Sequence, residues 1–235
     1  MLILKNLLKR VLRGKYAGLN QLDRKLEKYV DYDNGYFVEL GANDGVTQSN
    51  SLYFEKYRNW RGLLVEPAPQ NFLKCRKNRS SRSSIYCAAC VAFDYEQEFV
   101  RIAYSNLMST PVGLESDIQD PRAHASLGGQ FLRNGETMFE FGAVARPLNE
   151  LLLEADAPKL IDFLSLDVEG AELAVLHGVD HQVFRFKYVL VECRSFPRLN
   201  EYMEKQGYRF VEKLSGQDYL FTNDPAMNST PIGNA

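Results

Sequence analysis

The sequence has 235 residues, of which 45% are hydrophobic and 25% are charged, and this composition is typical of a folded globular protein with an ordinary core. The formal net charge of -2 provides no overall positive field, which argues against sequence-independent binding to nucleic acid. The length suits one α/β domain with a modest extension, and the expected partner is a small molecule or a saccharide.

Residues 1–30 are expected to form a helical N-terminal extension, and the first fifteen predict a basic amphipathic helix, because apolar residues recur at helical spacing with lysines and arginines between them. Two interpretations stay open: the helix packs on the domain or on a second subunit, or it lies on an anionic membrane surface. No apolar run reaches the roughly 20 residues that span a membrane. The 4 cysteines are too few for a disulfide framework, so a cytoplasmic location is expected.

Residues 31–35 form a turn cluster, at which the catalytic domain (residues 31–222) is expected to begin. Strands and helices then alternate along the chain: strand 36–40, helix 51–57, strand 62–65, helix 71–78, strand 84–91, helix 148–155, strand 161–166, helix 171–177, strand 188–192, helix 197–207, and strands 208–213 and 218–221. The polar tail 223–235 is expected to be frayed. This alternation predicts a doubly wound α/β fold that binds ligands at the carboxyl ends of its strands.

Residues 104–142 break this rhythm, and their glycines, prolines and aromatic residues predict a lid inserted over the site. His124 lies in this lid, where it is either a solvated loop residue or a general base with a pKa near the usual value of about 6.5. His177 and His181 flank Gly178 at a predicted helix end, and both are interpreted as partners of the helix dipole.

The pair Cys87 and Cys90 has the C-x-x-C spacing of some zinc sites. The surrounding residues 85–92 are those of a buried strand, and no second cysteine or histidine pair stands at zinc spacing. We therefore interpret both cysteines as packing residues.

The first strand runs directly into a glycine turn, residues 39–45, with the sequence ELGANDG. Glycine at such a turn lets the backbone approach a ligand closely. The dinucleotide fingerprint needs glycine where Asn43 and Val46 stand, and no Gly-Lys-Ser/Thr follows, so nicotinamide, flavin and phosphate-loop sites are disfavoured. A ligand without phosphates and with a cationic centre suits a loop that supplies Glu39 and Asp44.

Two further strand ends carry acids. Glu66, followed by Pro67, lies a little over 20 residues past the glycine turn, where doubly wound folds hold a ribose. The alternative is a solvent-facing glutamate. Asp167 and Glu169 follow the strand 161–166 and are expected at the same sheet edge as the glycine turn; the alternative is that they only cap and stabilise the next helix.

Three motifs together resemble the FkbM family of methyltransferases: FVELGANDG at residues 37–45, LVEP at 64–67 and FLSLDVEGAE at 163–172. The resemblance implies a class I methyltransferase fold, with a seven-stranded mixed sheet whose last strand is antiparallel. It also implies S-adenosylmethionine as the methyl donor and hydroxyl groups of sugars or natural products as acceptors.

By this resemblance, the methionine part of the cofactor is surrounded by Glu39, Gly41, Asn43 and Gly45. Glu66 is expected to hold its ribose. The sequence departs from the family in two places: many members have lysine where Ser165 stands, and residues 104–142 carry no family motif.

The sequence therefore predicts an O-methyltransferase acting on a saccharide or a related acceptor. One of Asp167, Glu169 and His124 is expected to remove the hydroxyl proton, with Asp167 contributing more than His124 and without a metal ion. Alternatively, the carboxylates hold magnesium or calcium. Two other functions remain open: an N-methyltransferase, and a non-catalytic module that binds the cofactor or docks on a membrane.

Overall fold

The computed structural model of the chain describes residues 14–133 and 135–223. Its main sheet has seven strands in the order β10-β11-β9-β8-β1-β2-β3. Their bounds are β1 Tyr36–Leu40, β2 Arg61–Val65, β3 Ser84–Tyr86, β8 Leu160–Leu166, β9 Arg185–Glu192, β10 Arg209–Lys213 and β11 Asp218–Thr222. Strand β11 runs antiparallel to both of its neighbours, and the other pairings are parallel. The predicted doubly wound α/β fold with a seven-stranded mixed sheet is confirmed.

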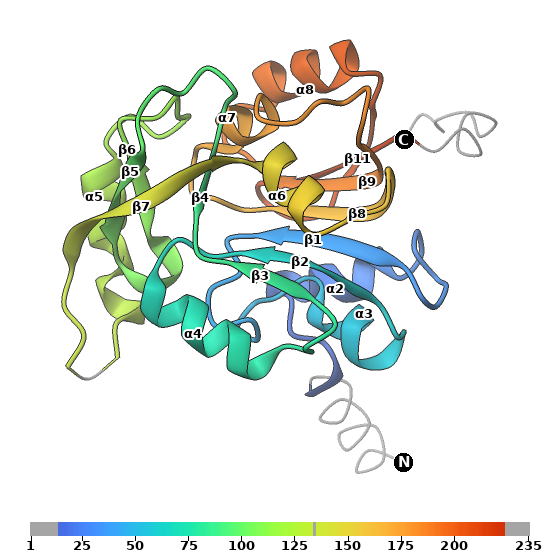
Figure 1. Cartoon of the computed structure of the whole chain (residues 1–235), viewed down its shortest axis with the longest axis horizontal. Helices are drawn as coiled ribbons and strands as arrows, with labels where there is room; N and C mark the ends of the chain where they lie inside the picture. The colour runs from blue at the N-terminus through green and yellow to red at the C-terminus, as the bar shows by residue number, and fades with distance from the viewer. Residues whose placement is uncertain (1–13, 134, 224–235) are drawn as a thin grey trace.

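Helices cover both faces of this sheet (Figure 1). On one side lie α6 Leu148–Glu154, α7 Glu172–Leu176 and α8 Phe196–Lys205, and on the other lie α2 Leu22–Leu26, α3 Leu52–Tyr57 and α4 Pro69–Asn78. Successive residues of a strand point to opposite faces of the sheet. In β1, Val38 and Leu40 pack in the core on the side of α6, α7 and α8, and Phe37 packs in the core on the side of α2, α3 and α4. Both faces of the sheet are therefore covered by packed side chains, and only the ends of the strands remain accessible to a ligand.

The predicted strand 84–91 is wrong in one respect, because the chain divides there between two sheets. Residues 84–86 extend the main sheet as β3, whereas β4 Ala89–Val91 pairs with the distant β7 Phe139–Pro147. Cys87 lies at the break and Cys90 in β4, and both thiols are free. Nonlocal pairing of this kind leaves no local signal in an apolar run.

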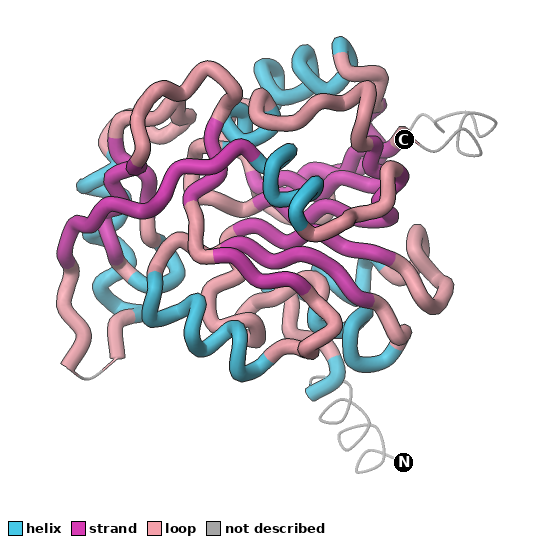
Figure 2. The backbone as a smooth tube through the Cα atoms, viewed as in Figure 1, coloured by secondary structure: helices cyan, strands magenta, loops and turns pink. Residues whose placement is uncertain are grey.

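The predicted lid also differs from expectation, because residues 104–142 are not a structureless insertion. They connect the strands of a second, four-stranded sheet in the order β4-β7-β5-β6, which stands apart from the main sheet in Figure 2. The other strands of this sheet are β5 Phe99–Tyr104 and β6 Thr110–Val112. The short helices between its strands are η2 Asn106–Met108, α5 Pro121–Leu127 and η3 Gly128–Phe131. The second sheet therefore has a small core of its own, which includes Val100 and Ile102.

The predicted basic helix and the predicted frayed tail fall almost wholly outside the described residues, which begin at Gly14 and end at Asn223. The short η1 Leu19–Gln21 and α2 follow, and Leu22 and Leu26 are buried under the main sheet. No helix within residues 14–133 and 135–223 is long and apolar enough to cross a membrane.

His181 lies in the core beyond α7, between two tyrosines. Its Nε2 is 3.2 Å from the Tyr202 hydroxyl, and its Nδ1 is 3.4 Å from the Tyr208 hydroxyl. Burial lowers the pKa of this imidazole to about 4. A neutral ring adds no charge to a helix end, so the predicted dipole role does not apply to His181.

We expect the free energy of unfolding to depend on this histidine at acid pH. An imidazole titrates near 6.5 in the unfolded chain, so its contribution is present above pH 6.5 and is lost as the pH falls toward 4. Between pH 7 and pH 4 the wild type should lose about 3 kcal/mol more than His181→Gln, which cannot titrate in this range. Urea unfolding at both pH values measures the difference, and equal losses would contradict the assignment.

Candidate functional site

The carboxyl ends of four adjacent strands, β9, β8, β1 and β2, meet at one edge of the main sheet. The register places Leu40 opposite both Val65 and Leu166, so these strands end level with one another. Their last residues and the loops that follow line a cavity of about 240 Å³. The predicted location of the site, at the carboxyl edge, therefore holds a real cavity.

Gly41 allows the ends of β1 and β8 to approach each other. Its φ is +78°, and a Cβ atom there would lie 1.9 Å from the carbonyl oxygen of Asp167. The amides of Gly41 and Ala42 both donate to the carbonyl of Val65, at 3.1 Å. A side chain at this position would therefore push apart the two strands that carry the site.

Glu66 lies in the wall of this cavity and is 4% exposed. Its Oε2 accepts the amide of Asn43 at 2.8 Å, and its Oε1 accepts the amide of Ala68 at 2.9 Å. Burial raises the pKa of Glu66 to about 7. Each oxygen keeps a lone pair beyond its single backbone bond, so the carboxylate has the right acceptor chemistry for the two hydroxyls of a ribose.

A test of this role is the variant Glu66→Ala, which should weaken S-adenosylhomocysteine binding at least about tenfold, because each charge-assisted hydrogen bond is worth about 1.5–3 kcal/mol. Binding by the wild type should strengthen as the pH rises through about 7, since only the ionised carboxylate accepts both hydroxyls. Calorimetry measures both effects, with Glu66→Gln as a control that keeps the shape of the side chain. A loss below about threefold would mean that Glu66 does not hold the ribose.

Glu39 also touches the cavity, but the loop after β1 already occupies its two oxygens. Oε1 accepts the amide of Asn50 at 2.8 Å, and Oε2 accepts the hydroxyls of Ser49 and Ser51 and a guanidinium N–H of Arg79 at 3.1 Å. The carboxylate therefore shapes the loop that forms the wall, and it offers a ligand little free acceptor capacity.

Asn43, Asp44, Gly45 and Pro67 complete the set of predicted cofactor residues. Asn43 and Pro67 line the cavity, whereas Asp44 and Gly45 lie behind its wall. Asp44 accepts the amides of Val46 and Thr47 at 3.0 and 2.7 Å, which is the bonding of a turn. Of the predicted cofactor residues, some therefore face the cavity, and others stabilise the conformation of the loop.

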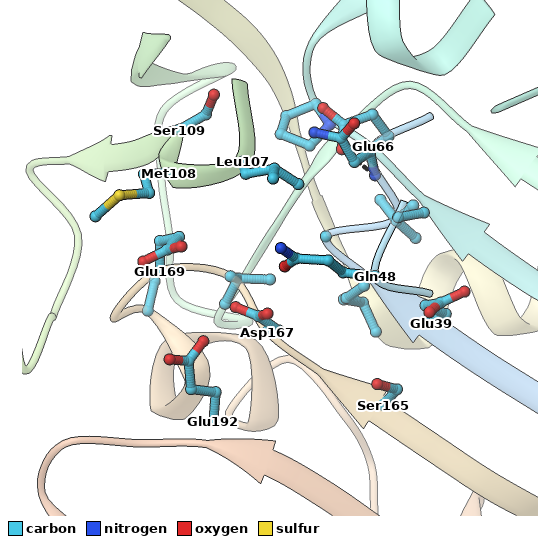
Figure 3. A pocket seen from close by; sticks show the side chains of 18 of the residues that line it. Glu39, Gln48, Glu66, Leu107, Met108, Ser109, Ser165, Asp167, Glu169 and Glu192 are labelled. Carbon is cyan, nitrogen blue, oxygen red and sulfur yellow. Dashed lines mark hydrogen bonds between the residues drawn. The ribbon is translucent and has the colours of Figure 1, made fainter. Parts of the chain in front are cut away.

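Three carboxylates gather at the other end of the cavity (Figure 3): Asp167, Glu169 and Glu192. They offer oxygens that lie within 4.8 Å of one another. Asp167 opens to the cavity, yet surrounding protein and the charge of Glu192 and Glu169 raise its pKa well above the usual range. The cluster therefore shares a proton more readily than isolated acids do.

His124 reaches this cluster from the lid helix α5. Its Nε2 lies 2.7 Å from Glu169 Oε2, and Nη2 of Arg194 lies 3.3 Å from the same oxygen. Burial and the charge of Glu192 raise the pKa of Glu169, while His124 and Arg194 oppose that rise. The structure thus brings the three predicted catalytic residues together, with His124 linked through Glu169.

The capping alternative for Asp167 is wrong. Helix α7 begins at Glu172, its cap residue is Ala171, and no side chain caps it. The amides of Val168 and Gly170 instead donate to the carboxylate of Glu172, at 3.1 and 3.0 Å. Asp167 is therefore left free to face the cavity.

Glu192 is the functional candidate that sequence reasoning missed. It is the last residue of β9, the parallel neighbour of β8, so its carboxylate reaches the same edge as Asp167. The available signal was an acid that ends a predicted strand, the same signal that singled out Glu66 and Asp167.

The roof of the cavity comes from the second layer. Leu107 and Met108 of η2 and Phe131 of η3 are apolar lining residues. The side chain of Asn43 donates to Asn106 Oδ1 at 3.1 Å, and Asn106 in turn donates to the carbonyl of Phe131 at 2.8 Å. The cavity thus combines an apolar roof, a buried diol acceptor at one end and anionic side chains at the other, which suits a nucleoside with a cationic sulfur.

A comparison with models of protein families agrees with this interpretation of the site. The family profile described as Methyltransferase FkbM domain matches residues 39–210. No curated protein sequence matches the chain.

Among solved structures, precorrin-6y C5,15-methyltransferase from Geobacter metallireducens has 14% identity and a TM-score of 0.41, covering 86% of each chain. TrmK of M. capricolum, in complex with S-adenosyl-homocysteine, has 8% identity and a TM-score of 0.40, covering 84% of this chain and 66% of that one.

The family match covers the first sequence motif from Glu39 onward, the other two motifs in full, and every strand end that lines the cavity. The chain therefore belongs to the FkbM family of methyltransferases, and S-adenosylmethionine is its methyl donor.

Proposed function

We propose that the protein is an O-methyltransferase that transfers a methyl group to a hydroxyl of a saccharide or a related polyhydroxylated acceptor. The observation that carries the proposal is the group of three carboxylates at the end of the cavity, in which the pKa of Asp167 is raised. A hydroxyl must lose its proton as its oxygen attacks, and a carboxylate with a raised pKa is the stronger base.

S-adenosylmethionine, when bound, supplies a methyl group on a positively charged sulfur. The chain's own residues then have three tasks. Glu66 accepts the ribose hydroxyls, and Asp167 accepts the proton of the acceptor hydroxyl. Glu169 is held by His124 and Arg194 and keeps the lid closed against the core. Fixed orientation of the reacting groups supplies most of the rate.

A second candidate is N-methylation, because the same three carboxylates can bind an ammonium group and one of them can take the proton that the nitrogen must lose before it attacks. The two functions differ in the atom that receives the methyl group. The test incubates the protein with methyl-labelled S-adenosylmethionine and a panel of matched sugars and amino sugars, and locates the label by mass spectrometry. We expect the label on oxygen. Label only on nitrogen would replace the proposal with N-methylation, and cofactor binding without any transfer would favour a non-catalytic module.

Metal removal is a separate test, because carboxylate oxygens are the ligands that magnesium and calcium prefer. In this cluster His124 Nε2 and an N–H donor of Arg194 already contact Glu169 Oε2. We therefore expect dialysis against EDTA to leave the rate of transfer unchanged. A lost rate that magnesium restores would assign the cluster to a cation.

A further inference from the structure

A second hollow, of about 480 Å³, opens beside the cavity at its carboxylate end. Its walls are η1 with the start of α2, the loop after the glycine turn, and the turn between β10 and β11. The two spaces share five lining residues: Leu19, Gln48, Asn50, Asp167 and Glu192. Asp167 and Glu192 therefore stand where the two spaces meet.

The walls of this hollow are fastened by specific contacts. A bridge joins Gly18 to Gln48, and the amides of Ala17 and Gly18 donate to Asp23 at 2.7 and 3.1 Å. Lys25 Nζ donates to the carbonyl of Leu214 at 2.5 Å, which ties α2 to the hairpin. The N-terminal segment is thus held on both sides of the opening, which makes the hollow a fixed part of the fold.

The hairpin side is fixed as well. The amide of Cys193, directly after Glu192, donates to the carbonyl of Gln217 at 2.9 Å. The Ser215 hydroxyl donates to the carboxylate of Asp218. The turn therefore keeps a constant position relative to the end of β9 that carries Glu192.

The polar side chains of this hollow are mainly amides and carboxylates, and Leu19 and Leu22 add an apolar patch to its wall. The amides come from Asn20, Gln48, Asn50 and Gln217, and the carboxylates from Asp167, Glu192 and Asp218. Among the described residues that line it, none is lysine, arginine or histidine. Amides donate and accept hydrogen bonds to hydroxyls, whereas three carboxylates repel a phosphate or another carboxylate.

The covered cavity and the open hollow have different linings, which suit different ligands. The cavity has the apolar roof of Leu107, Met108 and Phe131 and contains the diol acceptor Glu66. Apart from Leu19 and Leu22, the hollow is lined by polar side chains and Gly216, and none of the roof residues borders it. A methyl donor fits the first space, and a polar acceptor fits the second.

We propose that the methyl acceptor binds in the hollow between the N-terminal segment and the β10–β11 turn, as an uncharged or cationic molecule, and not beneath the lid. The inference rests on the proposed function, because it assumes that Asp167 and Glu192 face the reacting hydroxyl. The lid segment then covers the donor alone, which changes the sequence-based expectation that the acceptor lies under residues 104–142.

The test fills the hollow through one glycine position and uses a second glycine position, in the lid, as a control. Gly216, in the hairpin turn, and Gly129, in η3 of the lid, both have open space where a Cβ atom would stand. Gly216→Trp should fill the hollow, and Gly129→Trp is the control at the lid. The three probes are methyl glucopyranoside, glucosamine and glucose 6-phosphate. Their binding is measured by ligand-observed NMR with S-adenosylhomocysteine bound to the protein.

We expect methyl glucopyranoside or glucosamine to bind the wild type and Gly129→Trp, and the binding signal to fall at least about fivefold in Gly216→Trp. Glucose 6-phosphate should not bind. The inference would be overturned if glucose 6-phosphate bound, if only Gly129→Trp removed binding, or if none of the probes bound. Calorimetry with S-adenosylhomocysteine on the same three proteins separates failure of the inference from failure of the proposed function. If the wild type did not bind S-adenosylhomocysteine, the proposed function itself would be refuted.

Discussion

Replacing Asp167 by asparagine is expected to lower the single-turnover rate of methyl transfer about 10²–10⁴-fold, the usual contribution of a general base. The amide keeps the shape of the side chain and cannot accept the proton. Binding of S-adenosylhomocysteine should stay within about twofold of the wild type, because Glu66 is at the far end of the cavity.

The comparison variants are Glu169→Gln and His124→Ala, measured with saturating donor and acceptor. His124 meets the cluster only through Glu169, so its loss should slow the reaction less than the loss of Asp167. A slow reaction in His124→Ala alone would move the base to the lid. Normal rates in all three variants would show that the acceptor reacts elsewhere.

Replacing Arg79 by methionine is expected to destabilise the fold by about 3–5 kcal/mol, the cost of leaving buried charges unpaired. The guanidinium is fully buried and lies 3.1 Å from both Glu39 and Glu55. It also donates to the hydroxyl of Ser51 at 2.8 Å. Methionine fills much of the space but leaves two buried carboxylates without their cationic partner.

Urea unfolding at neutral pH measures this loss, with Lys205→Met as the control. Lys205 also pairs with a glutamate, Glu201, but both side chains are 68% exposed, so this variant should behave like the wild type. Arg79→Lys should lie between the two, because an ammonium lacks the fork that reaches both carboxylates. Equal stability of Arg79→Met and Lys205→Met would mean that the buried network is dispensable.

Most of the main sheet could be predicted because its central strands are short apolar runs that end in turn signals. The glycine turn at Gly41 and the acids at Glu66 and Asp167 follow from the same pattern. Parallel strands bring their carboxyl ends to one edge, so three separate sequence signals indicated one site.

The second sheet could not be predicted in this way. Strand β5 pairs with β7 across about forty residues, and β4 pairs with β7 across more than fifty, so neither contact is marked by a local turn. The prediction of a lid at residues 104–142 treated their glycine, proline and aromatic content as the deciding signal. Pairing with distant partners decided the structure instead.

The role of Glu39 shows a different limit. Its sequence position, just before the glycine turn, predicted contact with the cofactor. Its partner Arg79 lies forty residues away, at the end of α4, and nothing in the sequence links the two. Buried charge pairs are set by tertiary packing, so an acid in a motif can shape the loop that binds a ligand.

The most direct measurement is a crystal structure of the protein with S-adenosylhomocysteine. We predict that both ribose hydroxyls lie within about 3.2 Å of the Glu66 carboxylate and that the sulfur faces Asp167 and Glu192, where the cavity meets the second hollow. A nucleoside bound in the hollow, or a sulfur pointing away from these carboxylates, would contradict the account.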